Sequence, residues 1–209
     1  MYIPSYFHEE NPEILHGIIR ANSFATLVSQ SEGTLVASQL PFLFDAGRNV
    51  LRSHMARPNP QWRELCERAA MVIFQGPHAY ITPSWYEKKP AVPTWNYVTV
   101  HVYGTGRLIE DDAGLRSIVA ETVLQYESGR DRPWAMSLPE DYVGNMLRGI
   151  VGFEIAITRI EGKLKLSQNR SIADVEGVIA GLANEADPMG HELSGWMRRV
   201  CGQSKQPLE

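Results

Sequence analysis

The sequence predicts an α+β fold built on an antiparallel β-barrel with flanking helices. About six strand-like segments follow one another in hairpin order, interrupted by a few short helices, which favours an antiparallel over a parallel sheet. The segment 95–103 alternates cleanly, with Val98, Val100 and Val102 on one face and aromatic or polar residues on the other. Because bare sheet edges invite unwanted pairing, we expect closure of the barrel or strand pairing in a dimer.

Caps and turns place the first helix and the first two strands. Residues 11–13, Asn-Pro-Glu, combine a capping side chain, a proline at the first helical position and an acid near the positive end of the helix dipole. Strand-like segments at 24–28 and 34–44 flank a turn at 31–33. The apolar stripe of the helix consists of Ile14, Leu15, Ile18 and Ile19.

A third strand is predicted at 50–54, followed by a second helix. Asn59 and Pro60 repeat the earlier capping pattern, and we expect this helix to run through Ala69. Cys66 then shares one helical face with Trp62, Leu65 and Ala69, so we expect a small buried residue there. Two further strand segments, 71–74 and 78–81, flank a bend at Gly76-Pro77.

The second half of the chain predicts four helices and one more strand. Asp111-Asp112 caps a helix that reaches about residue 126, and Pro139-Glu140 begins another that ends near 148. The strand covers 149–158. A helix follows from 171, where Ser-Ile-Ala-Asp has the spacing of a capping box, and the last helix spans 187–200.

The segment 162–170, Gly-Lys-Leu-Lys-Leu-Ser-Gln-Asn-Arg, is the most informative polar stretch. Lys163 and Lys165 fall on one side of an extended segment and two leucines on the other. Two ammonium groups, the Ser167 hydroxyl and the Gln168 amide would then converge, as an anionic or polyoxygenated ligand requires. A solvated edge strand guarded by lysines is the alternative, and this segment alone favours that alternative.

The segment 53–62 joins a strand end to a predicted helix start. Free backbone N–H groups there, with His54 and Arg57 nearby, could cradle a phosphate. Under the alternative interpretation, Arg57 pairs with a surface acid and Asn59 only caps the helix.

Composition and missing motifs exclude several classes of protein. The chain has 209 residues, two cysteines without metal or redox spacing and a formal net charge of -4, which argues against a simple DNA-binding surface. No signal-like segment or membrane-length apolar run occurs, so we expect a cytoplasmic protein. The scattered histidines lack ligand spacing, so we expect no metal site. Dinucleotide, Walker and Gly-x-Ser-x-Gly motifs are also missing from the sequence.

Five segments together resemble the PaiB family, described as FMN-binding negative transcriptional regulators. They are residues 1–4, 54–62, 74–86, 95–97 and 162–170. The resemblance covers residues 1–182 and implies a split β-barrel similar to the pyridoxamine-phosphate oxidase and flavin reductase group. It leaves 183–209 as a helical tail.

The resemblance also implies that FMN lies at the interface of a homodimer. Phosphate contacts would come from Ser53, His54 and Arg57. Ring and ribityl contacts would come from Ser38, Gln39 and Leu40 on the second strand. The ring and ribityl contacts from the second subunit are expected from Trp95, Tyr97, Lys163, Lys165, Ser167 and Gln168.

The resemblance does not fix the activity. DNA binding follows from the family description alone, because the sequence shows no helix-turn-helix with a basic recognition helix. A flavin-dependent reductase remains an alternative, since the hydride chemistry belongs to the cofactor. A haem or small-molecule sensor that does not bind DNA is a third.

Overall fold

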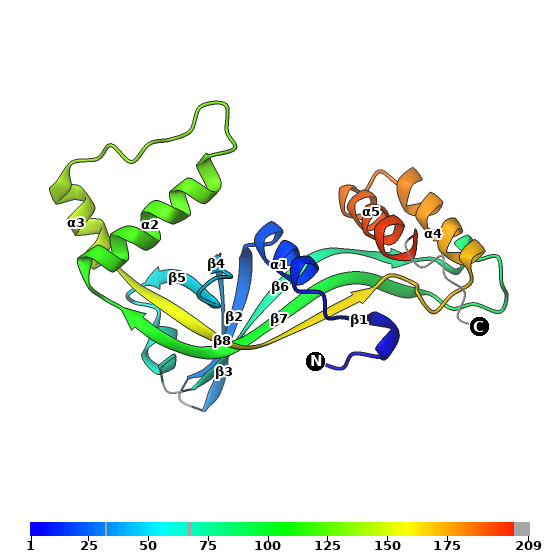
Figure 1. Ribbon diagram of the computed structural model, residues 1–209, viewed down its shortest axis with the longest axis horizontal. Helices are drawn as coiled ribbons and strands as arrows, with labels where there is room; N and C mark the ends of the chain where they lie inside the picture. Colours follow the sequence, from blue (N-terminus) through cyan, green and yellow to red (C-terminus); the bar gives the residue numbers. More distant parts are fainter. Residues whose placement is uncertain (32, 67, 203–209) are drawn as a thin grey trace. The chain divides into compact units, whose positions relative to one another are not determined.

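The computed structural model describes residues 1–31, 33–66 and 68–202. In this part of the chain eight strands form one sheet in the order β3-β2-β6-β7-β8-β5-β4, and β1 pairs with β8 (Figure 1). The pairs β2–β3, β2–β6, β4–β5, β5–β8 and β1–β8 are antiparallel. The strands are β1 (His8–Glu9), β2 (Phe24–Ser31), β3 (Thr34–Pro41), β4 (Leu43–Asp45), β5 (Val50–Ala56), β6 (Ala69–Ile81), β7 (Thr94–Ile109) and β8 (Ile150–Lys165).

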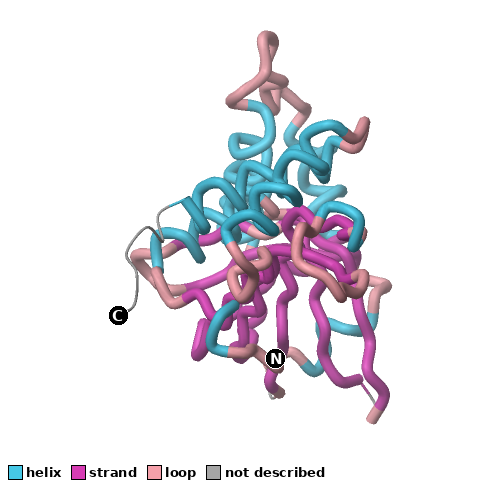
Figure 2. The backbone as a smooth tube through the Cα atoms, turned by 90° about the vertical axis from the view of Figure 1, so that its right-hand side faces the viewer, coloured by secondary structure: helices cyan, strands magenta, loops and turns pink. Residues whose placement is uncertain are grey.

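Five α-helices accompany these strands in the described residues, which confirms the predicted α+β class (Figure 2, helices in cyan). They are α1 (Pro12–Ala21), α2 (Asp112–Glu127), α3 (Glu140–Arg148), α4 (Ile172–Asn184) and α5 (Pro188–Gly202), together with the 3-10 helices η1 (Ser5–Phe7), η2 (Pro60–Glu64) and η3 (Pro83–Trp85). No helix in the described ranges is long and apolar enough to cross a membrane.

The chain divides into two compact units, and β6, β7 and β8 contribute residues to both. Unit 1 comprises Met1–Leu15, Gln75–Val100 and Glu161–Glu209, and unit 2 comprises His16–Phe74 and His101–Ile160. The predicted boundary between residues 182 and 183 remains a prediction. In the structure α4 ends at Asn184.

Unit 2 contains an aromatic core. The rings of Phe42 and Phe74 meet edge to face at 6.0 Å between centroids, and Phe42 meets Phe153 at 6.2 Å. All three side chains are at most 1% exposed. Their burial removes large apolar areas from water, and Phe153 lies opposite Ser53 in the β5–β8 pairing, so this core lies beside the strand that carries Ser53 and His54.

Capping residues, strand alternation and turn residues in the sequence predicted most elements correctly. Asp111 caps α2 by accepting from the Gly114 N–H at 2.8 Å, and Ser171 caps α4 by accepting from the Asp174 N–H at 3.2 Å. Val98, Val100 and Val102 are fully buried, as the alternation predicts. The turn before β3 uses Gly33 at a φ of 78°, a conformation that favours glycine.

The predicted helix from Asn59 to Ala69 is wrong in its extent. Only the 3-10 helix η2 forms, although Asn59 does cap it by accepting from the Gln61 N–H at 3.1 Å. The turn ends because the Leu65 carbonyl accepts instead from the Gly106 N–H at 2.9 Å. Leu65 is fully buried, whereas Cys66 is exposed, so the expectation of a buried cysteine is also wrong.

The strands also differ in their boundaries from the segments that the sequence predicted. The segments 71–74 and 78–81 are one strand, β6, in which Gly76 allows close approach of Val98 on β7. The segments 149–158 and 162–165 are likewise one strand, β8. The predicted strand 34–44 divides into β3 and β4.

Unit 1 contains α4 and α5, which lie side by side (Figure 1). Gly177 and Gly181 on α4 face Trp85, and a side chain at either position would collide with that tryptophan. The absence of a Cβ atom therefore allows Trp85 to contact the backbone of the helix directly.

Candidate functional site

The predicted site residues fall into two groups, one in each unit. Unit 2 holds Ser38, Gln39, Leu40, Ser53, His54 and Arg57. Unit 1 holds Trp95, Tyr97, Lys163, Lys165, Ser167 and Gln168.

In unit 2, β3 and the segment after β5 are joined by polar contacts. The Asn59 amide donates to the Ser38 hydroxyl at 3.0 Å. Ser53 is 1% exposed, and its hydroxyl donates to the Pro41 carbonyl at 2.6 Å. Gln39 is exposed and Leu40 half-buried in the β2–β3 pairing. These contacts hold the predicted phosphate-binding segment against the sheet.

His54 is half-buried on β5, opposite Gly152 of β8. Burial lowers the pKa of its imidazole below the ordinary value of 6.5, so the ring is neutral near pH 7. Its buried Nδ1 atom has no hydrogen-bond partner among the described residues. A buried polar atom left unpaired is costly, and this one is available to a ligand or a water molecule.

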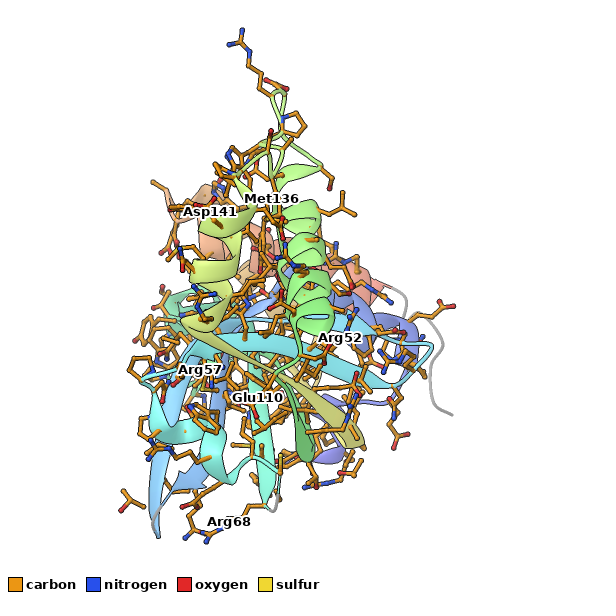
Figure 3. The ribbon with its side chains drawn as sticks, turned by 90° about the vertical axis from the view of Figure 1, so that its left-hand side faces the viewer. Arg52, Arg57, Arg68, Glu110, Met136 and Asp141 are labelled. Atoms are coloured by element: carbon orange, nitrogen blue, oxygen red, sulfur yellow. The ribbon has the colours of Figure 1, made fainter. Side chains whose placement is uncertain are left out.

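Arg57 is held by protein groups, as the alternative sequence interpretation expects. Its Nε donates to the Arg148 carbonyl at 3.0 Å, and one terminal nitrogen donates to the Ile150 carbonyl at 3.0 Å. The other terminal nitrogen pairs with Glu110 at 3.2 Å (Figure 3). A phosphate contact by Arg57 remains a prediction, and it would compete with Glu110.

In unit 1, Lys163 is buried, with 8% of its surface exposed. Its ammonium group donates to the Tyr2 carbonyl at 3.0 Å and lies 5.3 Å from the centre of the Tyr97 ring. The expectation of a solvated edge strand is therefore wrong at this position. β8 pairs with β7, β5 and β1, so it has neighbours on both sides.

Lys165 lies two residues further along β8 and is partly exposed. Its ammonium group donates to the Trp95 carbonyl at 2.7 Å and to the Thr94 hydroxyl. Burial lowers its pKa, and the positive charges of Lys163 and Arg170 lower it further. A bound anion would relieve this repulsion, so the position favours negatively charged or electron-rich ligand atoms.

A small pocket of about 130 Å³ lies beside Lys165. Asn96 lines it and is 1% exposed, and its amide nitrogen donates to the Ser167 hydroxyl at 2.9 Å. The Asn96 Oδ1 atom has no partner among the described residues. Ser167 adopts a φ of 67°, which is uncommon for a residue other than glycine and is frequent at ligand sites.

Sequence reasoning missed Asn96, Thr94 and Arg170 as members of this pocket. Asn96 has a recognisable signal, because it continues the alternating face formed by Val98, Val100 and Val102. A polar residue in register with a buried aliphatic row needs a hydrogen-bond partner, and Ser167 supplies one. Arg170 ends the polar segment 162–170, and that position was its only signal in the sequence.

Gln168 and Trp95 do not line the pocket beside Lys165. Gln168 accepts from the Leu166 N–H at 2.7 Å and donates to the Leu164 carbonyl, so its amide closes the turn after β8. Trp95 is 53% exposed and lies 6.1 Å from Tyr80 between ring centroids. No group of three metal-ligating side chains occurs among the residues that the structure describes.

Known proteins resemble this chain in sequence. A family model described as "Putative FMN-binding domain" matches residues 1–159. The protease synthase and sporulation protein PAI 2 of Bacillus subtilis is 40% identical over 203 residues, which cover 94% of this chain and 96% of that protein. An uncharacterized protein of Emericella nidulans, AN0679, is 32% identical over 95% of this chain and 96% of its own length.

Solved structures resemble the fold at lower sequence identity. The FAD and heme binding protein of Mycobacterium smegmatis has a TM-score of 0.59 and 19% identity, covering 83% of this chain and 80% of that one. The flavocytochrome Anf3 of Azotobacter vinelandii has a TM-score of 0.58 and 14% identity, covering 78% and 72%. These likenesses confirm the predicted antiparallel split β-barrel with flanking helices.

The family match covers most of the chain, and the resemblance to PAI 2 extends over nearly all of it. Of the five segments that resemble the family, residues 1–4 precede the first element, and the other four lie on β5, β6, β7 and β8 and on the segments that follow them. FMN is the cofactor that the family match assigns. The chain therefore belongs to the PaiB family of FMN-binding split-barrel proteins.

Proposed function

We propose that the protein is a cytoplasmic homodimer that binds FMN at its dimer interface and acts in negative regulation of transcription, the role described for the PaiB family. The observation that carries the flavin site is the polar set around Lys165. It combines an ammonium group whose pKa is lowered by burial and by like charges, an unpartnered Asn96 oxygen and a strained Ser167.

The residues present fit the chemistry of FMN. Its ribityl hydroxyls and ring carbonyls need donors and acceptors, which Lys165, Ser167 and Asn96 of the second subunit would supply. The terminal phosphate would be held by the segment that contains Ser53, His54 and Arg57, in which the Nδ1 atom of His54 is unpartnered. Ser38, Gln39 and Leu40 of β3 would contact the ring. FMN, when bound, supplies hydride or electron transfer.

Dimerisation is supported by an exposed aromatic pair, Tyr80 on β6 and Trp95 on β7. Trp95 is 53% exposed and Tyr80 is 49% exposed, and the two rings contact each other. Aromatic side chains of this kind are enriched at the centres of protein interfaces. In the proposed dimer Trp95, Tyr97, Lys163, Lys165, Ser167 and Gln168 of the second subunit complete the flavin site.

Titration calorimetry with FMN and riboflavin tests this assignment. Lys165→Ala removes a contact proposed for the ring or ribityl chain, so it should weaken both ligands by about ten-fold or more. Lys88→Ala removes an exposed lysine of the same unit and should change neither affinity. Full affinity of the Lys165→Ala protein for FMN would place the flavin elsewhere.

A flavin-dependent oxidoreductase is the second candidate. It is favoured by the acidic net charge of -4 and by α4, whose sequence contains no lysine or arginine. A spectrum of the purified protein with bands near about 375 and 450 nm would show bound flavin, whereas a Soret band would favour the sensor alternative. Anaerobic bleaching of the flavin bands by NADH or NADPH would favour the reductase.

A further inference from the structure

A second pocket in unit 1 lies between α4, α5 and the turn that follows β8. Its volume is about 580 Å³, within the roughly 300–1,000 Å³ typical of small-molecule sites. Ile172, Val175, Ile179 and Ala180 give it apolar walls. The chamber is therefore suited to the apolar body of a small organic molecule.

The same pocket carries an excess of positive charge. Arg170 and Arg198 line it together with one acid, Glu176. Arg170 lies 4.6 Å from the centre of the Tyr86 ring, and neither arginine forms an ion pair with a described residue. Unpaired guanidinium groups beside an apolar chamber favour a ligand with its own negative charge.

Asp174, a buried carboxylate near this pocket in the sequence, feels the positive charge of Arg170, but the two form no ion pair. Asp174 is 1% exposed, and one of its oxygens accepts from the backbone N–H groups of Glu87 and Lys88 at 2.9 and 3.1 Å. Those bonds, the Lys88 one above all, lower the pKa of Asp174, and the charge of Arg170 helps to lower it. This carboxylate therefore holds the segment after η3 against α4, and its attraction to Arg170 offsets part of the positive charge at the pocket.

We infer that this pocket binds a small organic anion, a carboxylate or sulfonate with a flat or branched apolar body, independently of FMN. The apolar body lies against α4, and the anionic group lies at Arg170 and Arg198. Arg170 also lines the pocket beside Lys165, so an anion bound here changes the charge next to the proposed flavin contacts. The pocket is thus an effector site placed to modulate the flavin.

Two fluorescent naphthalene probes test the charge requirement. 8-Anilinonaphthalene-1-sulfonate is an apolar aromatic anion, and N-phenyl-1-naphthylamine is its neutral counterpart. One sulfonate should bind per chain, and Arg198→Gln should weaken it about five-fold without changing the neutral probe. Arg199→Gln is the matched control, because Arg199 lies over the Trp196 ring at 4.3 Å and does not line the pocket. Equal effects of the two variants would overturn the inference.

Cys201 supplies a second readout, independent of fluorescence. It lines the pocket, its thiol donates to the Leu166 carbonyl at 3.6 Å, and burial raises its pKa. In a Cys66→Ser background, the sulfonate should slow alkylation of Cys201, and Ala180→Phe, which fills the chamber, should abolish that protection. Unchanged protection in the Ala180→Phe protein would place the probe elsewhere.

One further outcome would contradict the inference. Protection of Cys201 by FMN at its binding concentration would show that the pocket belongs to the flavin. Failure of FMN binding, measured separately, would count against the proposed function and leave these results standing.

Discussion

Arg57 offers a test of how unit 2 is held together and of whether its arginine can serve a phosphate. Its side chain donates to the Arg148 carbonyl at the end of α3 and to the Ile150 carbonyl at the start of β8. Its own backbone N–H donates to the Gly149 carbonyl at 2.8 Å. Arg57 therefore binds three successive residues at the junction of α3 and β8.

The expected cost of Arg57→Ala follows from these contacts. Each buried hydrogen bond from a charged donor is worth about 1.5–3 kcal/mol, but the Arg57 side chain is 40% exposed, so water replaces part of what is lost. We expect a loss of about 2 kcal/mol in the free energy of unfolding. For a chain of this size that is a fall of about 4–8 °C in thermal midpoint.

Glu110→Gln is the matched control, because it removes only the ion pair with Arg57. Both partners are substantially exposed, at 40% and 50%, so the expected loss is below about 1 kcal/mol. Scanning calorimetry of the two variants separates the contributions. A loss in Glu110→Gln as large as that in Arg57→Ala would refute the reasoning that the backbone carbonyls dominate.

The same two variants test the phosphate role. If Arg57 holds the phosphate of FMN, Arg57→Ala should weaken FMN by about 1.5–3 kcal/mol and leave riboflavin nearly unchanged. Glu110→Gln should leave FMN affinity equal or stronger, because it frees a guanidinium nitrogen. Equal losses for FMN and riboflavin in the Arg57→Ala protein would place Arg57 away from the phosphate.

Four other outcomes are expected. Light scattering at micromolar concentration should give the mass of a homodimer, whose interface should exceed roughly 2,000 Å² in total if the dimer is obligate. Trp95→Ser should shift the mass toward that of the monomer, and a monomeric parent protein would contradict the prediction. Burial keeps the folded-state pKa of His54 below 6.5, so its contribution to stability is complete above pH 6.5 and is lost as the pH falls through the folded-state pKa. His54→Asn should therefore flatten the dependence of the thermal midpoint on pH. Identical slopes for the parent and variant proteins would argue against this role of His54. Gly181→Ala should lower the free energy of unfolding by about 1–3 kcal/mol, because the added methyl group collides with Trp85. Gly195→Ala, in open space on α5, should be neutral or stabilising. Similar thermal melts for the two variants would count against this packing of Trp85 on α4. A mobility-shift assay in about 150 mM salt should show weak DNA binding without sequence preference, and a tight selective shift would show the opposite.

The sequence predicted features that depend on neighbouring residues. A cap such as Asp111 or Ser171 reaches a backbone N–H only three positions away, so the local pattern contains the whole interaction. The valine row of β7 is similar, because the two-residue period of a strand assigns its faces whatever lies opposite. The family resemblance added the split-barrel type of that fold and the cofactor, which no periodicity shows.

Features that depend on distant partners could not be predicted in this way. The turn after Asn59 ends at Leu65 because Gly106, far along the chain, takes up its carbonyl. Lys163 is buried because Tyr2 offers an acceptor and a ring, which the alternation of residues 162–166 cannot reveal.

The candidate site shows the same division. The sequence at 163–168 predicted a polar cluster, because its lysines, serine and glutamine alternate with or follow two leucines. Only the tertiary structure decided that Asn96 pairs with Ser167 and that Arg57 is occupied by the carbonyls of residues 148 and 150. The residue type fixes the charge and the hydrogen-bonding groups of a side chain. Which partner meets those groups depends on the strands and helices that the fold brings together.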